Sequence, residues 1–68
     1  MHPKAEIRVA AVWCIINLTW PDENGSSNRV DLLRSLGFEE RLMAMEFDSS
    51  LDVRERVATA LLHFSGKQ

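Results

Sequence analysis

The sequence predicts an all-α fold, and three observations support this prediction. Apolar residues recur at intervals of three and four along most of the 68 residues, as they do on one face of a helix. No segment alternates apolar and polar residues for long enough to form a strand. Proline, glycine and serine lie between the apolar segments, where helices typically begin and end. We therefore expect four helices, of which the first and the last have the strongest pattern.

The first predicted helix spans residues 3–18 and is apolar on nearly every face. Pro3 suits its first turn, because the N–H that proline lacks would be unpaired there, and Pro21 prevents the helix from continuing. Its apolar residues are Ile7, Val9, Ala11, Val12, Trp13, Cys14, Ile15, Ile16 and Leu18. Such a helix is stable only where neighbours cover it on several sides.

Two short helices are expected after a polar surface loop at residues 22–27. The first spans residues 28–36, with Ser27 as its N-cap and Gly37 as the residue that ends it. The second runs from Phe38 to about Phe47. Their apolar positions are Val30, Leu33 and Leu36 in the first helix, and Phe38, Leu42, Met43, Met45 and Phe47 in the second.

The last predicted helix follows a break at residues 48–50. Ser49 and Asp52 have the spacing of a capping box at its start, and Gly66 ends it. Its apolar face consists of Val53, Val57, Ala60, Leu61 and Phe64.

The first and last helices match each other at a constant offset of 46 residues. The matched pairs are Glu6 with Asp52, Ile7 with Val53, Arg8 with Arg54, Ala11 with Val57, Cys14 with Ala60, Ile15 with Leu61, and Leu18 with Phe64. Stacked helical solenoids have periods of about 40 to 47 residues. The sequence therefore indicates an internal repeat of this kind.

The residues of this repeat resemble the armadillo family over almost the whole chain. Residues 28–37 (NRVDLLRSLG), 38–45 (FEERLMAM) and 52–64 (DVRERVATALLHF) resemble the short first helix, the second helix and the long third helix of one armadillo repeat. Residues 7–18 (IRVAAVWCIINL) resemble the third helix of a preceding repeat. The resemblance implies an armadillo-like segment over residues 1–68: a third helix at 1–21, a loop at 22–27 and one complete repeat at 28–66.

The resemblance also implies a function, namely that of a non-catalytic scaffold for protein–protein interaction. Residues 2–21, with the acidic Gly-Ser loop that follows, resemble more narrowly the C-terminal repeats of armadillo scaffold subunits of the CTLH/GID ubiquitin ligase. The expected partners are other protein subunits or further armadillo repeats. One repeat cannot bury its own apolar face, and about three are normally needed. We therefore expect a piece of a longer solenoid, or else self-association through the apolar flanks.

Trp13 and Asn17 are the first candidates for contact with a partner. They lie four residues apart, hence on one face of the helix. In armadillo proteins such as importin-alpha, this pair lies on the concave surface and holds an extended peptide, which gives an alternative function for the chain. The matching residues of the last helix are Thr59 and His63, so the pattern is broken there. Otherwise Trp13 and Asn17 pack against and cap a neighbouring helix.

Three further residues are candidates for partner binding: Trp20, Arg8 and Arg54. Trp20 follows the end of the first helix, where a large aromatic side chain either fills a gap in the stack or anchors a partner. Arg8 and Arg54 occupy a repeated position. Each either pairs with an acidic residue of the adjacent repeat or loop, or contacts a partner.

Composition and motifs argue against several other functions. The lone Cys14 excludes an internal disulfide and multi-cysteine zinc sites, and we expect it to be a small core residue. His2 and His63 are not at metal-binding spacing, and no nucleophile, base and orienting group occur together, so we expect no metal, cofactor or enzyme activity. A net charge of -2 argues against nucleic-acid binding. The apolar run at residues 9–16 is shorter than the ~20 residues of a membrane span. We expect a protein of the cytoplasm or nucleus.

Overall fold

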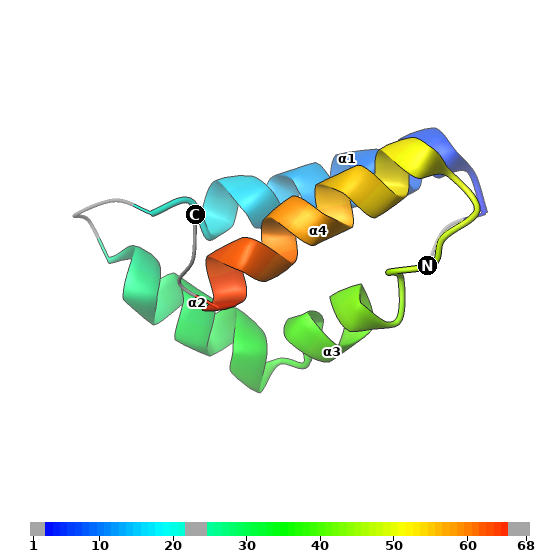
Figure 1. Cartoon of the computed structure of the whole chain (residues 1–68). Helices are drawn as coiled ribbons and strands as arrows, with labels where there is room; N and C mark the ends of the chain where they lie inside the picture. Colours follow the sequence, from blue (N-terminus) through cyan, green and yellow to red (C-terminus); the bar gives the residue numbers. More distant parts are fainter. Residues whose placement is uncertain (1–2, 22–24, 66–68) are drawn as a thin grey trace.

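The computed structural model describes residues 3–21 and 25–65 (Figure 1). Its four helices are α1 (Ala5–Leu18), α2 (Ser26–Ser35), α3 (Phe38–Met43) and α4 (Leu51–Ser65). The part of the chain that is described contains no strand. The predicted all-α, armadillo-type fold class is confirmed.

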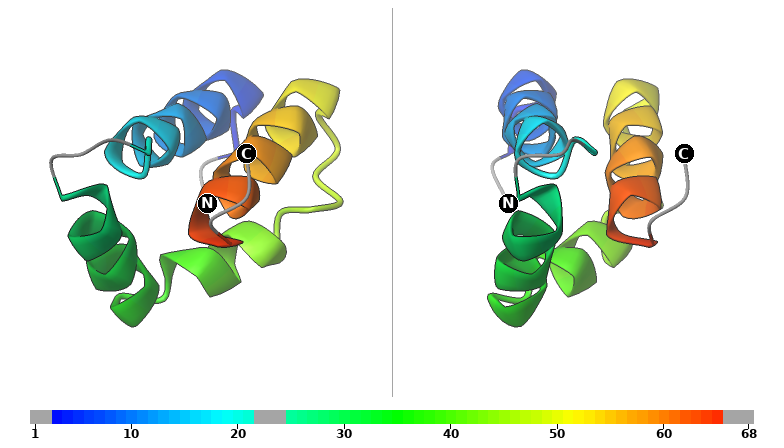
Figure 2. Two further views of the ribbon diagram at one scale, coloured as in Figure 1. Left: turned by 60° about the vertical axis from the view of Figure 1, so that its left-hand side comes forward. Right: turned by 90° about the vertical axis from the view of Figure 1, so that its left-hand side faces the viewer.

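The two long helices, α1 and α4, lie side by side and run in the same direction (Figures 1 and 2). Contacts at both ends agree with this arrangement, because Arg8 bonds Asp48 near the start of the pair and Thr19 bonds His63 near its end. The short helices α2 and α3 lie together on one side of the pair (Figure 2). Residues far apart in the sequence are thereby brought together along the whole length of α1.

The hydrophobic core lies where α4 meets α1 and α3. Its buried side chains are Val12, Ile15 and Ile16 of α1, Leu42 of α3, and Val53, Val57, Ala60 and Phe64 of α4. Removing such side chains from water supplies about 25 cal/mol per Å² of apolar surface, which is the main term that holds the helices together. Four of the five residues of the predicted apolar face of the last helix are therefore in the core, and the fifth, Leu61, is partly buried against it.

Helix α2 fixes the ends of both long helices through two arginines. Arg29 Nε donates to the carbonyl oxygen of Leu18 at 2.7 Å, and Arg34 Nη2 donates to that of Phe64. Carbonyl groups in the last turn of a helix have no partner within the helix, and a cation there also complements the helix dipole. Since Leu18 and Phe64 are 46 residues apart, α2 makes the same kind of contact at two repeat-related positions.

Gly37 ends α2 as predicted and joins it directly to α3. Its φ of 84° lies in the left-handed region, which glycine adopts without strain. The Gly37 N–H donates to the carbonyl of Arg34, and the Gly37 carbonyl accepts from the N–H of Arg41. Gly37 therefore caps both the C-terminus of α2 and the N-terminus of α3.

Two helix starts differ from the prediction. Helix α1 begins at Ala5, because the Lys4 carbonyl accepts the N–H groups of both Ile7 and Arg8; Pro3 thus precedes the helix and is not in its first turn. Helix α2 begins at Ser26, so that Ser27 lies inside the first turn and is not the N-cap. The N-cap position is held by Gly25, whose φ of 91° reverses the chain two residues earlier than expected.

The connection between α3 and α4 also differs from the prediction. Helix α3 ends at Met43, not near Phe47, because the next residues form tight turns such as Met45 N–H to Leu42 carbonyl at 2.9 Å. The N-cap of α4 is Ser50 and not Ser49, since the Ser50 hydroxyl accepts the N–H of Val53. Residues 1, 2, 22–24 and 66–68, including His2 and Gly66, lie outside the described residues.

Candidate functional site

Trp13, Asn17 and Trp20 lie along one exposed face of α1 and of the turn that follows it. Their spacings of four and three residues place them on the same side. The Trp20 N–H lies 3.4 Å from the Asn17 carbonyl oxygen, which continues the helical path for one more turn. Trp13 is 44% exposed and Trp20 is 53% exposed. Two indole rings and one amide are therefore presented to solvent together.

Helix α4 places a cation against the first of these rings. The Arg56 guanidinium lies 5.1 Å from the centroid of the Trp13 ring. Arg56 is itself oriented by Asp52, one turn earlier, with Nε to Oδ1 at 3.4 Å. A guanidinium over an indole face is attracted by the electron density of the ring. The contact favours one orientation of Trp13 without covering it.

The second ring is placed by His63. The Trp20 and His63 rings meet edge to face, with centroids 5.4 Å apart and planes at 88°. His63 Nδ1 lies 3.1 Å from Thr19 Oγ1, and the buried Thr19 hydroxyl donates to the carbonyl of Ile15 at 2.8 Å. A hydroxyl has a single hydrogen to donate, so it accepts from Nδ1–H of His63.

We call this surface the tryptophan face; it consists of Trp13, Asn17, Trp20, Arg56 and His63. It combines broad apolar planes with an amide that can donate to and accept from a peptide backbone, and with donors for an acidic side chain. Aromatic and arginine side chains are also those most often found at the energetic centre of protein interfaces. The tryptophan face is thus suited to bind protein or peptide.

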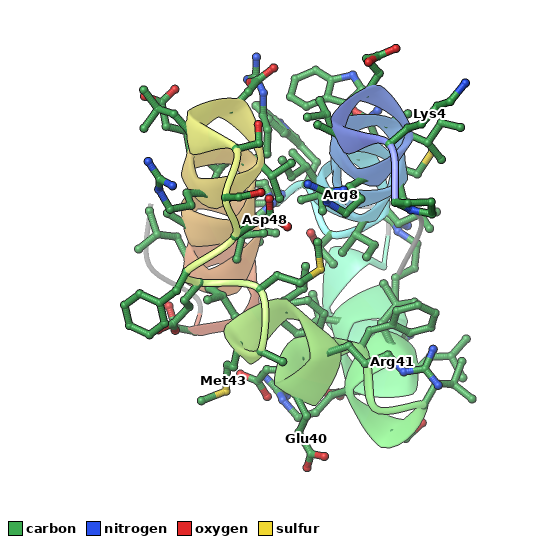
Figure 3. The ribbon with its side chains drawn as sticks, turned by 90° about the vertical axis from the view of Figure 1, so that its right-hand side faces the viewer. Lys4, Arg8, Glu40, Arg41, Met43 and Asp48 are labelled. Carbon is green, nitrogen blue, oxygen red and sulfur yellow. The ribbon has the colours of Figure 1, made fainter. Side chains whose placement is uncertain are left out.

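Arg8 and Arg54 converge on Asp48, the residue between the α3 turns and α4. Arg8 binds the Asp48 carboxylate with two atoms, Nε to Oδ2 and Nη2 to Oδ1, both at 2.9 Å (Figure 3). Arg8 Nη1 also donates to the Pro3 carbonyl at 2.7 Å. Arg54 Nη1 donates to the Asp48 main-chain carbonyl at 2.6 Å. The two repeat-related arginines therefore hold one acidic residue from two sides.

The environment of Asp48 holds its pKa below the ordinary value of 3.8. The hydrogen bond from the Arg8 side chain is the largest cause, and the bond from the Ser50 N–H is the next. Both favour the ionised carboxylate. Asp48 is thus a fixed negative charge that ties α1 to the start of α4.

Arg8 and Arg54 are accordingly engaged within the chain. The Arg8 side chain is only 14% exposed, and Figure 3 shows it directed at Asp48. Trp20 lies at the other end of α1, so the structure does not bring the five predicted partner-binding residues into one site. It unites Trp13, Asn17 and Trp20. Contact of Arg8 or Arg54 with a partner stays a prediction.

A second surface consists of apolar positions that α1 leaves bare. We call it the α1 stripe: Ile7, Ala11, Cys14 and Leu18. Ile7 and Leu18 are nearly half exposed, Cys14 is exposed and Ala11 is half-buried, whereas the residues 46 positions later, Val53, Val57, Ala60 and Phe64, are all buried. Equivalent residues of the two helices thus have opposite environments.

The reverse holds for the face that α1 buries. We call the equivalent positions of α4 the α4 stripe: Ala58, Leu61, Leu62 and Ser65. Their partners by the same offset are Val12, Ile15, Ile16 and Thr19, which are buried. Ala58, Leu62 and Ser65 are exposed and Leu61 is half-buried. Each long helix therefore buries the face that the other leaves bare.

Sequence reasoning also missed other exposed apolar residues. Phe47, which was expected on the apolar face of a helix, is 89% exposed because the chain turns after Met43. Leu51 at the start of α4 and Met43 are also exposed, and Met43 points outward in Figure 3. No periodic pattern separates these residues from core positions. The sequence indicated only that some apolar residues must be exposed, because it has more of them than four short helices can bury.

Cys14 and the metal-ligating side chains can also be placed in the structure. Cys14 is exposed, contrary to the expected core position, because the helix side on which it lies has no neighbour. Within residues 3–21 and 25–65, no three histidine, cysteine, aspartate or glutamate side chains are grouped to hold a metal ion. None of the described helices is long and apolar enough to cross a membrane.

Comparison with known proteins finds several curated relatives. The chain is 40% identical to GID complex subunit 5 of Schizosaccharomyces pombe over 69 residues, which cover 94% of this chain and 9% of that protein. It is 36% identical to armadillo repeat-containing protein 8 of Danio rerio and 33% identical to that of Mus musculus, each over 63 residues, or 93% of this chain and 9% of the relative.

The family resemblance predicted from the sequence is confirmed by these matches. The chain spans about a tenth of the length of the relatives, since each alignment covers 9% of them. No family model matches the sequence, and no solved structure matches it.

Proposed function

From the homology of this chain to a segment of armadillo repeat-containing proteins, we propose that it is a non-catalytic protein-interaction scaffold. It forms one part of a longer armadillo solenoid within a ubiquitin-ligase complex of the CTLH/GID kind, in the cytoplasm or nucleus. Residues 1–21 supply the third helix of one repeat and residues 28–66 supply the next repeat. Its partners are further repeats and other protein subunits, with self-association through the apolar flanks as a further mode.

The exchange of buried and bare faces between α1 and α4 is the observation that carries this proposal. In a stack of repeats, each repeat contacts only its neighbours, so a helix inside the stack has a covered face on either side. The α1 stripe is bare on the side where a preceding repeat would lie, and the α4 stripe is bare where a following repeat would lie. The chain has the surfaces of an internal section of a stack.

Energetics support the same conclusion. A chain of this size seldom gains more than about 3 to 5 kcal/mol from a single apolar core. Leaving Ile7, Leu18 and Leu62 about half exposed forgoes part of the stabilisation that burial would give, at about 25 cal/mol per Å². Covering both stripes with neighbouring helices recovers it. A rigid stack can then present a continuous surface to other subunits.

The test is affinity purification of the tagged protein from the cells that express it, followed by mass spectrometry. We expect homologues of GID complex subunits to co-purify. Leu62→Asp, on the α4 stripe, should reduce their recovery, whereas Leu32→Asp, at a more exposed leucine of α2, should retain it. Recovery of none of these subunits with the unmodified protein would contradict the proposed function.

A second candidate function is a peptide-binding groove of the importin type, centred on Trp13 and Asn17. The exposure of Trp13 beside Arg56, with the Asn17 amide one turn away, favours it. The test selects peptides that bind the chain from a displayed random library. Asn17→Ala should abolish binding of the selected peptides while circular dichroism is unchanged. Asn28→Ala, at an exposed asparagine of α2, is the matched control and should bind as before.

A further inference from the structure

We propose that the tryptophan face selects peptides that carry an aspartate or glutamate side chain, and that Arg56 is the residue that selects them. The proposal rests on the peptide-binding function given above as the second candidate. It goes further, because it names the charge of the ligand and assigns a role to a residue of α4 outside the pair of Trp13 and Asn17. The bound segment is an extended peptide of a partner protein, and its acidic side chain contacts Arg56.

The position of Arg56 disfavours a basic ligand. An exposed indole ring can attract a lysine or arginine of a ligand through its electron density. In this chain the Arg56 guanidinium already lies 5.1 Å from the centroid of the Trp13 ring. A ligand cation at this ring would lie close to a like charge, which weakens binding. The cation–π site of Trp13 is therefore used within the chain.

The terminal nitrogens of Arg56 are available to a ligand. Its ion pair with Asp52 is closest at Nε, which lies 3.4 Å from Oδ1. Among the described residues, none accepts a hydrogen bond from Nη1 or Nη2 of Arg56. The Arg56 side chain is 45% exposed, so a ligand can reach these atoms. Two parallel N–H groups of a guanidinium match the two oxygens of a carboxylate, which makes this edge of Arg56 a carboxylate-binding site.

The contact with Asp52 is compatible with this role. The two residues are four positions apart on α4, and the Asp52 side chain is 59% exposed. An exposed pair of this kind contributes little to stability, so a ligand carboxylate has little to displace. Asp52 approaches the Nε side of the guanidinium and leaves the terminal N–H groups unoccupied. It therefore helps to orient Arg56 without blocking the proposed site.

The tryptophan face itself includes the positive charge of Arg56 and no acidic side chain. Asp52 lies one turn before Arg56, and Glu6 lies two turns before Trp13 on α1. Glu55 directly precedes Arg56, and adjacent residues of a helix do not share a face. Among the described residues, negative charge on these sides of α1 and α4 is therefore confined to one end. The surface from Arg56 onward is complementary to an acidic ligand.

Asn17 and Arg56 would bind different parts of one peptide. Asn17 is exposed one turn beyond Trp13, and its amide can donate to and accept from a peptide backbone. The guanidinium of Arg56 can donate only, which suits an acidic side chain. Loss of Asn17 should therefore weaken the binding of every peptide, whereas loss of Arg56 should change which peptides are preferred.

Selection from a displayed random library tests the charge preference. Peptides that bind the unmodified chain should be enriched in aspartate and glutamate at one position and depleted in lysine and arginine there. Enrichment in lysine and arginine, or no enrichment in either kind of charge, would overturn the proposal.

A double-mutant cycle tests whether Arg56 is the residue responsible. Fluorescence anisotropy measures the affinity of a selected peptide and of the same peptide with its acidic residue changed to the matching amide. The amide peptide should bind the unmodified chain about tenfold more weakly, the effect of losing a hydrogen bond to a charged group. Arg56→Gln should bind the two peptides within about twofold of each other, because the group that distinguishes them is absent. An unchanged ratio in Arg56→Gln would overturn the assignment.

Charge reversal provides a matched control. Arg56→Glu should select peptides with lysine or arginine at the position where the unmodified chain selects an acid. Arg41 lies 5.7 Å from the Phe38 ring of α3, outside the tryptophan face, so Arg41→Glu should keep the acidic preference. Both arginines are exposed, and both variants should keep their helical circular dichroism. A preference that reverses in both variants, or in neither, would contradict the role of Arg56.

The result is distinguishable from a failure of the peptide-binding function. If peptides bind without regard to charge and Asn17→Ala abolishes their binding, the peptide-binding function stands and the selective role of Arg56 is wrong. If no displayed peptide binds the unmodified chain, both are wrong. Recovery of GID complex subunits from cells tests the scaffold function separately and does not depend on either result.

Discussion

Helices α1 and α4 have similar sequences at repeat-related positions, yet their environments are exchanged. Phe64 of α4 is 3% exposed, whereas its equivalent Leu18 in α1 is 48% exposed. Ile16 of α1 is fully buried, whereas its equivalent Leu62 in α4 is 46% exposed. The difference shows that burial here depends on which neighbours exist and not on the residues themselves. An apolar residue in a repeat protein reaches its full stabilising effect only when the adjacent repeat is present.

Paired truncations of Phe64 and Leu18 should show the largest effect. Phe64→Ala removes a buried ring and should cost about 3 to 5 kcal/mol, as much as a core of this size provides. Leu18→Ala at the equivalent, half-exposed position should cost less than about 1 kcal/mol. Urea unfolding followed by circular dichroism measures both. Equal costs would mean that the two faces do not differ as described.

The two repeat-related arginines provide the next comparison. Arg8→Gln leaves the Asp48 carboxylate without its two-atom partner, whereas Arg54→Gln removes one bond to the Asp48 main-chain carbonyl. A bond to an ionised group contributes more than one to a neutral group. Arg8→Gln should therefore lower the melting temperature by several degrees, and Arg54→Gln by less. The reverse order would contradict the described roles.

The pH dependence of stability should report the same contact. The pKa of Asp48 is lowered in the folded chain, so the ionised carboxylate stabilises the fold. This contribution is complete above the ordinary pKa of 3.8 and is lost as the pH falls through the lower folded value. Chemical denaturation at a series of pH values from neutral to strongly acidic measures it.

Asp48→Asn is the control for that measurement. It should be less stable at neutral pH, and it should lose less stability on acidification than the unmodified chain. Parallel curves for the two proteins would show that Asp48 is not the group responsible.

Much of the fold followed from the sequence because helices are determined by local patterns. The 3.6-residue period of α4 and the left-handed glycine at Gly37 act over a few residues, and both were predicted correctly. Boundaries were less accurate where a single capping interaction decides them. Ser50 and not Ser49 caps α4, because Asp48 Oδ1 also holds the Ser50 N–H.

The sites were predicted less completely because they depend on contacts between distant residues. The spacing of Trp13 and Asn17 identified them as candidates. The contact of Arg56 with Trp13 could not be predicted, because it depends on how α4 packs along α1. Arg8 pairs with an acidic side chain, which is one of the two roles predicted for it, whereas Arg54 bonds the main-chain carbonyl of the same residue. Their shared acceptor, Asp48, lies on a turn that periodicity does not describe. Periodicity identified the excess of apolar residues in α1 but not which of its faces is bare.

The smallest predicted effect concerns Trp13, where α4 contacts α1 without burying it. Arg56→Gln removes the cation 5.1 Å from the Trp13 ring and should lower stability by about 0.5 to 1 kcal/mol, the usual range for an exposed cation–π pair. In a Trp20→Phe background, in which Trp13 alone fluoresces, the same change should increase quenching by acrylamide. Arg41→Gln, which removes a similar contact at 5.7 Å from the Phe38 ring, should leave that quenching unchanged. If acrylamide quenches Trp13 fluorescence equally in the Arg56→Gln and Arg41→Gln variants, Arg56 does not orient the Trp13 ring. The tryptophan face would then be formed by α1 alone.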